Sequence, residues 1–212
     1  MVSPSAASGP AHAGSPLDQA LIAAAETNDA QAVRRALSDG ADPEARDARG
    51  RTALMAAVQN NHVAAAQVLI AAGADVNAKD EIQDSPYLLS GARGYLEILR
   101  LTLAHGADLK STNRYGGTAL IPAAERGHVE AVRTLIEAGV DVDHVNRLGW
   151  TALLEAIILG NGGERHTEIV RLLLEAGADP NLADRDGVTP LQHARQRGYA
   201  EMERLLAARG GR

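Results

Sequence analysis

The chain has 212 residues, a formal net charge of −6 and 45% hydrophobic residues, with no cysteine, no phenylalanine and a single tryptophan. The lack of cysteine excludes a disulfide scaffold and thiolate chemistry, and the acidic balance disfavours the basic surface typical of a nucleic-acid-binding protein. No stretch reaches the roughly 18 apolar residues of a membrane-spanning helix. Because aromatic residues are scarce, we expect a core of small aliphatic side chains.

The first segment, residues 1–16, is rich in serine, glycine, alanine and proline. This composition is typical of a disordered tail, and the segment lacks the charged start and apolar centre of a signal peptide. We therefore expect a cytoplasmic protein. The alternative is a periplasmic protein from which a signal peptide has been removed.

A repeat dominates the rest of the chain. Gly-Ala-Asp or Gly-Val-Asp begins at five glycines with spacings of 33, 33, 33 and 38 residues: Gly40, Gly73, Gly106, Gly139 and Gly177. The same spacings separate five hydroxyl-bearing residues: Thr52, Ser85, Thr118, Thr151 and Thr189. Such a period indicates a stack of similar units, each contacting only its neighbours. We expect six units, the first and last being caps: 17–49, 50–82, 83–115, 116–148, 149–186 and 187–212.

One unit, residues 116–148, illustrates the local prediction. Thr118 stands where a helix N-cap belongs, so a short helix is expected after it, bent by Pro122. A second helix follows Gly127, because apolar residues recur there at helical spacing: Val129, Val132, Leu135 and Ile136. Gly139 is placed to end this helix, and the Asp- and Gly-bearing residues after it favour a hairpin-like turn into the next unit.

These segments resemble the ankyrin repeat. The run Gly73-Ala74-Asp75-Val76-Asn77 matches the segment after the family's second helix, and Gly127-His128 matches the turn between the helices. Thr189-Pro190-Leu191-Gln192-His193-Ala194 is close to the family's helix start, with Gln192 in the usual histidine place. The resemblance covers residues 17–210. It implies an all-α solenoid of stacked helix-turn-helix units with β-hairpin-like fingers, about six repeats including the two caps, which binds a protein on its concave side.

The same resemblance places finger tips and the outer face of the first helices on that concave side. Hydrophobic residues stand on the fingers of the middle units, as anchors of a protein interface commonly do: Ile82, Tyr115, Leu148 and Trp150. Alternatively, Tyr115 and Trp150 lie flat on neighbouring fingers and only bridge them. Arg114 and Arg147 occupy one finger position in successive units, either as the charged rim of the patch or as ordinary solvated arginines.

Two further departures from the repeat are candidates for contact with a partner. Glu125 and Glu155 belong to adjacent first helices, where they form either an acidic pocket or two unrelated surface carboxylates. The five-residue insertion at 161–165 separates the helices of the fifth unit, and its glycines favour a mobile loop.

No catalytic, cofactor-binding or metal-binding motif stands out. The run Asp141-Val142-Asp143-His144 lies in a finger, where Asp is favoured by turn chemistry. We therefore predict a non-enzymatic, monomeric, bacterial protein-interaction module that needs no cofactor and binds an unidentified protein, not nucleic acid or membrane. The alternatives are an exported periplasmic ankyrin protein that supports oxidative-stress defence, and a spacer without a specific partner.

Overall fold

The computed structural model describes residues 14–212, and this part of the chain contains twelve α-helices and no β-strand. The helices are α1 (Pro16–Glu26), α2 (Ala30–Ser38), α3 (Ala53–Gln59), α4 (Val63–Ala71), α5 (Pro86–Arg93), α6 (Leu96–Ala104), α7 (Leu120–Glu125), α8 (Val129–Glu137), α9 (Ala152–Ile158), α10 (Glu164–Glu175), α11 (Pro190–Arg197) and α12 (Ala200–Ala208). Two helices per unit confirm the predicted all-α repeat fold. Most of the tail predicted at 1–16, namely 1–13, lies outside the described residues.

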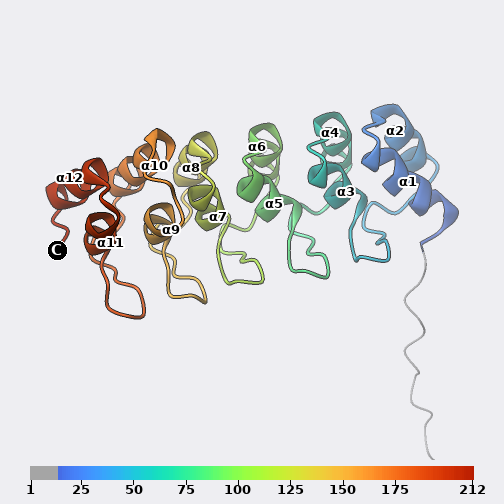
Figure 1. Ribbon diagram of the computed structural model, residues 1–212. Coiled ribbons are helices and arrows are strands. Elements are labelled where there is room, and N and C mark those ends of the chain that lie inside the picture. The colour runs from blue at the N-terminus through green and yellow to red at the C-terminus, as the bar shows by residue number, and fades with distance from the viewer. Residues whose placement is uncertain (1–13) are drawn as a thin grey trace, which may run out of the picture.

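The helix pairs stack side by side into a curved array (Figure 1). The first helices of successive units pack on one another, as α5 does on α7 and α7 on α9, and the second helices form a parallel layer. The loops that join one unit to the next all project on the side of the first helices (Figure 1). We call these loops the fingers. Because the fingers stand in a row, positions one repeat apart in sequence are neighbours in space.

Most first helices begin with the predicted hydroxyl cap. The side chains of Thr52, Ser85 and Thr151 each accept the backbone N–H three residues further on at 3.2 Å, and Thr189 does so at 3.3 Å. The prediction for Thr118 is wrong. Helix α7 starts only at Leu120, and the buried Thr118 hydroxyl has no hydrogen-bond partner within residues 14–212.

Pro122 explains this exception. In the neighbouring units the carbonyl oxygen of the cap residue accepts an N–H from four residues on, as Thr151 does from Glu155 at 3.0 Å. Proline has no N–H to donate there. The Ile121 N–H donates to the Thr118 carbonyl instead, at 3.3 Å, and is not available to the Thr118 hydroxyl. The distortion predicted at Pro122 is therefore a lost first turn rather than a bend within the helix.

Every finger is shaped by one Asp or Asn side chain. In the fourth finger, Asn146 Oδ1 accepts the backbone N–H of Leu148 at 2.9 Å and that of Trp150 at 3.1 Å. Its own N–H donates to the Trp150 carbonyl at 3.0 Å. The same turn recurs in the other fingers at Asp47, Asp80, Asn113 and Asp184. This Asx turn holds the finger closed without a strand ladder.

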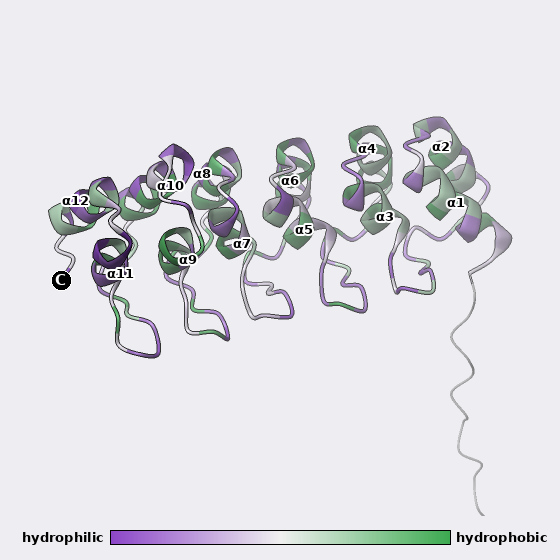
Figure 2. Ribbon diagram, viewed as in Figure 1, coloured by the Kyte–Doolittle hydropathy of each residue, from purple (hydrophilic) through white to green (hydrophobic). Residues whose placement is uncertain are grey.

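The core runs between the two helix layers and is made mainly of alanine and branched aliphatic residues, with Tyr87, Met55 and Met202 among them. Hydrophobic residues are concentrated in the helices, whereas α11, in the C-terminal unit, is mainly hydrophilic (Figure 2). Small side chains let neighbouring helices approach closely. One consequence is at Gly91 in α5, where an added Cβ would come within 2.9 Å of the Ala119 Cβ.

Helix α1 begins at Pro16, next to the expected start of the first unit. Ser15 and Asp18 form a capping box, with the Asp18 N–H 3.2 Å from the Ser15 hydroxyl and the Ser15 N–H 2.8 Å from the Asp18 carboxylate. Pro16 stands at the first helical position, where a missing N–H costs nothing.

The insertion at 161–165 is mostly absorbed into structure rather than left as a long loop. Helix α10 starts at Glu164 and has 12 residues, whereas α8 has 9. The remaining loop is fastened at both sides: His166 Nε2 lies 2.8 Å from the Glu125 carbonyl oxygen, and the Tyr199 hydroxyl donates to the Gly160 carbonyl at 3.1 Å. These tethers join the loop to the units before and after it.

Candidate functional site

A cleft of about 390 Å³ opens on the finger side of the middle units. Its walls come from three successive fingers and its floor from helices α5, α7 and α9. We call it the finger cleft. Six of the eight residues predicted to bind a partner line it: Ile82, Arg114, Tyr115, Leu148, Glu125 and Glu155. The other two, Arg147 and Trp150, do not.

The rim of the finger cleft is hydrophobic at one repeated position. Ile82, Tyr115 and Leu148 follow one another at 33-residue intervals and are 52%, 55% and 51% exposed. Each lies two residues after the Asp or Asn that shapes its finger, and that turn presents the side chain outward. Tyr115 is therefore not buried against neighbouring fingers, whereas Trp150 is half-buried.

The two arginines of the predicted charged rim differ in their contacts. The Arg114 guanidinium lies 4.7 Å from the centre of the Tyr115 ring and 3.8 Å from the Asp84 carboxylate, inside the finger cleft. Arg147 instead joins two fingers. Its guanidinium donates to the Arg114 carbonyl at 2.8 Å, and its backbone N–H donates to the Tyr115 carbonyl at 2.9 Å. Arg147 thus has a structural role in holding the fingers together.

The floor of the finger cleft carries two carboxylates. Glu155 lies in α9, is only 5% exposed, and accepts a hydrogen bond from the Asn146 side-chain amide at 2.7 Å. Burial, together with the nearby charge of Glu125, raises the pKa of Glu155 to about 7, although the Asn146 bond and Arg126 act against this. Glu125 in α7 is half-buried, and its carboxylate makes no hydrogen bond or ion pair within residues 14–212.

A third carboxylate stands at the wall. Burial and the charge of Asp80 raise the pKa of Asp84, although Arg114, Arg126 and Arg93 act in the opposite direction. The finger cleft therefore combines an exposed hydrophobic rim with carboxylates that are poorly hydrated in the free protein.

Comparison with known proteins decides the family. The sequence model described as "Ankyrin repeats (3 copies)" matches residues 11–80 and 88–184, and a second, "Ankyrin repeats (many copies)", matches residues 163–207. The chain belongs to the ankyrin-repeat family. No curated protein matches it.

Two solved bacterial ankyrin structures are similar to this chain. An ankyrin repeat domain from Acinetobacter baumannii is 68% identical, with a TM-score of 0.89 over 91% of this chain and 98% of that one. An ankyrin repeat protein from Enterococcus is 44% identical, with a TM-score of 0.86 over 90% of this chain and 97% of that one. The predicted family and repeat architecture are therefore confirmed.

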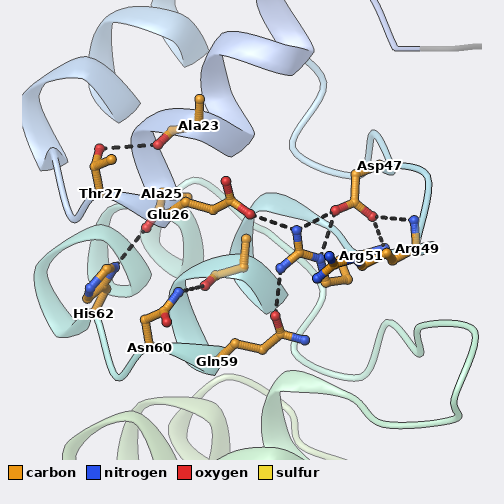
Figure 3. A network of polar contacts seen from close by, with 11 residues as sticks. Ala23, Ala25, Glu26, Thr27, Asp47, Arg49, Arg51, Gln59, Asn60 and His62 are labelled. Carbon is orange, nitrogen blue, oxygen red and sulfur yellow. Dashed lines mark hydrogen bonds and ion pairs between the residues drawn. The ribbon is translucent and has the colours of Figure 1, made fainter.

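In the first and the last finger of this ankyrin stack, the Asp that shapes the finger has a side-chain nitrogen partner. At the N-terminal end, Arg51 donates to Asp47 at 2.7 Å, to Gln59 at 2.6 Å and to Glu26 at 2.7 Å (Figure 3). In the last finger, His193 Nε2 lies 2.7 Å from the Asp184 carboxylate. Both carboxylates thus have a nitrogen partner of the protein itself.

Several residues of the ankyrin finger cleft escaped the sequence prediction. Asn146 belongs to the repeated finger pattern, Asp84 occupies the variable position before an N-cap, and Arg126 directly follows α7. A signal did exist for Asn146. The finger residue is Asn at both Asn113 and Asn146, and only Asn146 is followed nine residues later by a carboxylate, that of Glu155.

Within residues 14–212 no three His, Asp or Glu side chains are grouped so that they could hold a metal ion. None of the helices in that range is long and apolar enough to cross a membrane.

Proposed function

We propose that this ankyrin-repeat protein is a non-enzymatic interaction module that binds a protein partner in the finger cleft. Ankyrin repeats in general act as protein-interaction modules. The observation that carries the assignment is the row of Ile82, Tyr115 and Leu148, each about half exposed on three adjacent fingers. Exposed aromatic and aliphatic clusters beside a concave floor are typical of protein interfaces.

The charge distribution favours a protein over nucleic acid as the partner. The net charge is −6, and carboxylates occupy the floor of the finger cleft. Three arginines and three carboxylates line the cleft, so it lacks the excess of positive charge on which nucleic-acid-binding surfaces depend. We also propose that the free protein is a monomer, which light scattering after gel filtration would check.

The test compares two changes to exposed hydrophobic residues. In the variant Tyr115→Ala/Leu148→Ala the rim of the finger cleft is truncated. In the control Val145→Ala an equally exposed side chain (50%) is removed from the same finger as Leu148, but outside the cleft. Because these residues are exposed, each change should alter the free energy of unfolding by no more than about 0.5 kcal/mol per residue.

Wild-type and variant proteins are immobilised and used to capture partners from a bacterial lysate, with quantitative mass spectrometry as the measurement. We expect the cleft variant to lose at least roughly tenfold of the specifically captured protein, as anchor residues do on truncation, while the control retains it. Equal capture by all three proteins, or no specific capture by the wild type, would contradict the proposed function.

A further inference from the structure

We infer that the finger cleft accepts a lysine or arginine side chain of the partner protein, with its cationic head at the Glu155 carboxylate and its methylene stem between the fingers. This inference rests on the proposed function and adds the chemistry that the cleft selects.

The first observation is the state of the Glu155 carboxylate. It lines the finger cleft and is 5% exposed. One oxygen, Oε1, is held by Asn146 at 2.7 Å, and the other, Oε2, has no hydrogen-bond donor within residues 14–212. No Lys, Arg or His of that range lies within ion-pair distance of it either. Arg126 acts on this carboxylate only from beyond ion-pair distance. A buried carboxylate without a cation in direct contact is costly, so the cleft favours a cation brought from outside.

The second observation is that the arginines around the finger cleft have other partners. Arg126 donates to the Ala92 carbonyl at 2.8 Å, and Arg114 lies between Asp84 and the Tyr115 ring. Arg93 also lines the cleft, and its charge lowers the pKa of Asp84 rather than that of Glu155. Glu125, in contrast, adds a second negative charge beside Glu155.

The third observation is the shape of the approach to Glu155. The exposed side chains of Ile82, Tyr115 and Leu148 border the opening, and the carboxylates lie at its floor. Lysine and arginine match a hydrophobic opening above an acidic floor, because each has an apolar stem that packs on hydrophobic surface and a positively charged end. A bare metal ion does not match, since it would use the carboxylates but leave the hydrophobic rim without a role.

The test is a selection from a displayed library of random 12-residue peptides. The targets are the wild-type protein, Glu155→Gln and the rim variant Tyr115→Ala/Leu148→Ala, with Glu137→Gln as a control for loss of an exposed carboxylate on α8. We expect the wild type and Glu137→Gln to enrich peptides with a Lys or Arg flanked by apolar residues. Affinity for Glu155→Gln should fall roughly tenfold or more, the effect of losing a charged hydrogen-bond partner.

The outcomes separate the two proposals. If cleft-dependent peptides are enriched but carry no shared basic residue, or bind Glu155→Gln equally well, the cation inference is wrong while the proposed function stands. If no peptide distinguishes the wild type from the rim variant, both are wrong. Replacing the selected basic residue by norleucine, which keeps the stem and removes the charge, should reduce affinity as much as Glu155→Gln does.

The dependence of affinity on pH supplies a second, independent readout. A cation binds ionised Glu155, so affinity for an enriched peptide should rise up to about tenfold per pH unit below pH 7 and level off above it. The Glu155→Gln variant should show no such rise. If affinity instead falls as the pH rises through 7, protonated Glu155 is donating a hydrogen bond to the partner, and the inference is overturned.

Discussion

The last finger and the fourth finger use the same two positions in opposite ways. In the last finger the carboxylate is on the finger, at Asp184, and the nitrogen donor is on the helix, at His193, 2.7 Å away. In the fourth finger the nitrogen donor is on the finger, at Asn146, and the carboxylate is on the helix, at Glu155, also 2.7 Å away. The spacing is nine residues in both, so the framework tolerates either arrangement.

The exchange changes the environment of the carboxylate. Burial favours a higher pKa for Asp184, but hydrogen bonds from the Val188 backbone, the His193 ring and the Asp186 backbone outweigh it and lower the pKa. Glu155 receives one such bond and its pKa rises to about 7. The last finger therefore stabilises its negative charge internally. The fourth finger presents a poorly stabilised charge to the finger cleft, and this difference is what suggests a binding role.

The largest predicted effect comes from forcing both positions to be acidic. In Asn146→Asp, two buried carboxylates face each other with no donor between them, which should cost roughly 3 kcal/mol of unfolding free energy at pH 8. The cost should be smaller at pH 5, because one proton can then be shared by the two groups. Chemical denaturation at both pH values measures it.

The matching control recreates the arrangement of the last finger. In the double variant Asn146→Asp/Glu155→His the finger supplies the carboxylate and the helix the imidazole, as Asp184 and His193 do. Most of the lost stability should return, giving a large coupling energy in the double-mutant cycle. A double variant as unstable as Asn146→Asp alone would show that the two fingers are not equivalent.

The contrast between these fingers also shows which parts of the fold and of the finger cleft could be predicted from the sequence. The repeat period, the hydroxyl caps and the finger Asp or Asn are set by local chemistry and recur at fixed spacing, so the helix pairs and their stacking were predictable. Ile82, Tyr115 and Leu148 were identified because stacking places equivalent positions side by side. The Asn146–Glu155 pair was not, since a hydrogen bond between a finger and a helix depends on side-chain geometry.

Two residues illustrate the other limits. Arg147 and Arg114 occupy the same repeat position, but only coordinates show that Arg147 is used to join fingers while Arg114 faces the finger cleft. Arg185 repeats the Arg147 contact by donating to the Arg147 carbonyl, so Arg114 is the member that departs from the pattern. The failed cap at Thr118 follows from the missing N–H of Pro122, which redirects a neighbouring bond.

A second, smaller effect is expected from neutralising the carboxylate of the fourth finger. The pKa of Glu155 rises from 4.5 to about 7 on folding, so the unfolded chain loses its proton first as the pH increases. Wild-type stability should therefore fall between pH 4.5 and 7 by an amount on the order of 2–3 kcal/mol that Glu155→Gln avoids. The variant should match the wild type at pH 4.5 and exceed it at pH 8 in thermal denaturation. Equal stability at pH 8 would mean that Glu155 is not strained by burial.

The smallest predicted effect concerns Pro122, which occupies the position in its unit that is equivalent to Glu155 and His193. The change Pro122→Ala supplies an N–H for the Thr118 carbonyl and frees the Ile121 N–H for the Thr118 hydroxyl, as at Thr151 and Thr189. A gained cap and backbone bond exceed the entropy lost with proline, so we expect a gain of about 1 kcal/mol. Slower amide exchange at Ile121 would report the new cap.

Pro190 provides the matched control for this change. It occupies the first position of α11, where no N–H is needed. Pro190→Ala should therefore lose a few tenths of a kcal/mol up to about 1 kcal/mol, through the greater freedom of the unfolded chain alone. Opposite signs for the two proline changes would show that the missing N–H shortens α7. Loss of stability in both would mean that α7 starts late for a reason outside its backbone, such as the packing of Pro122 in the finger cleft.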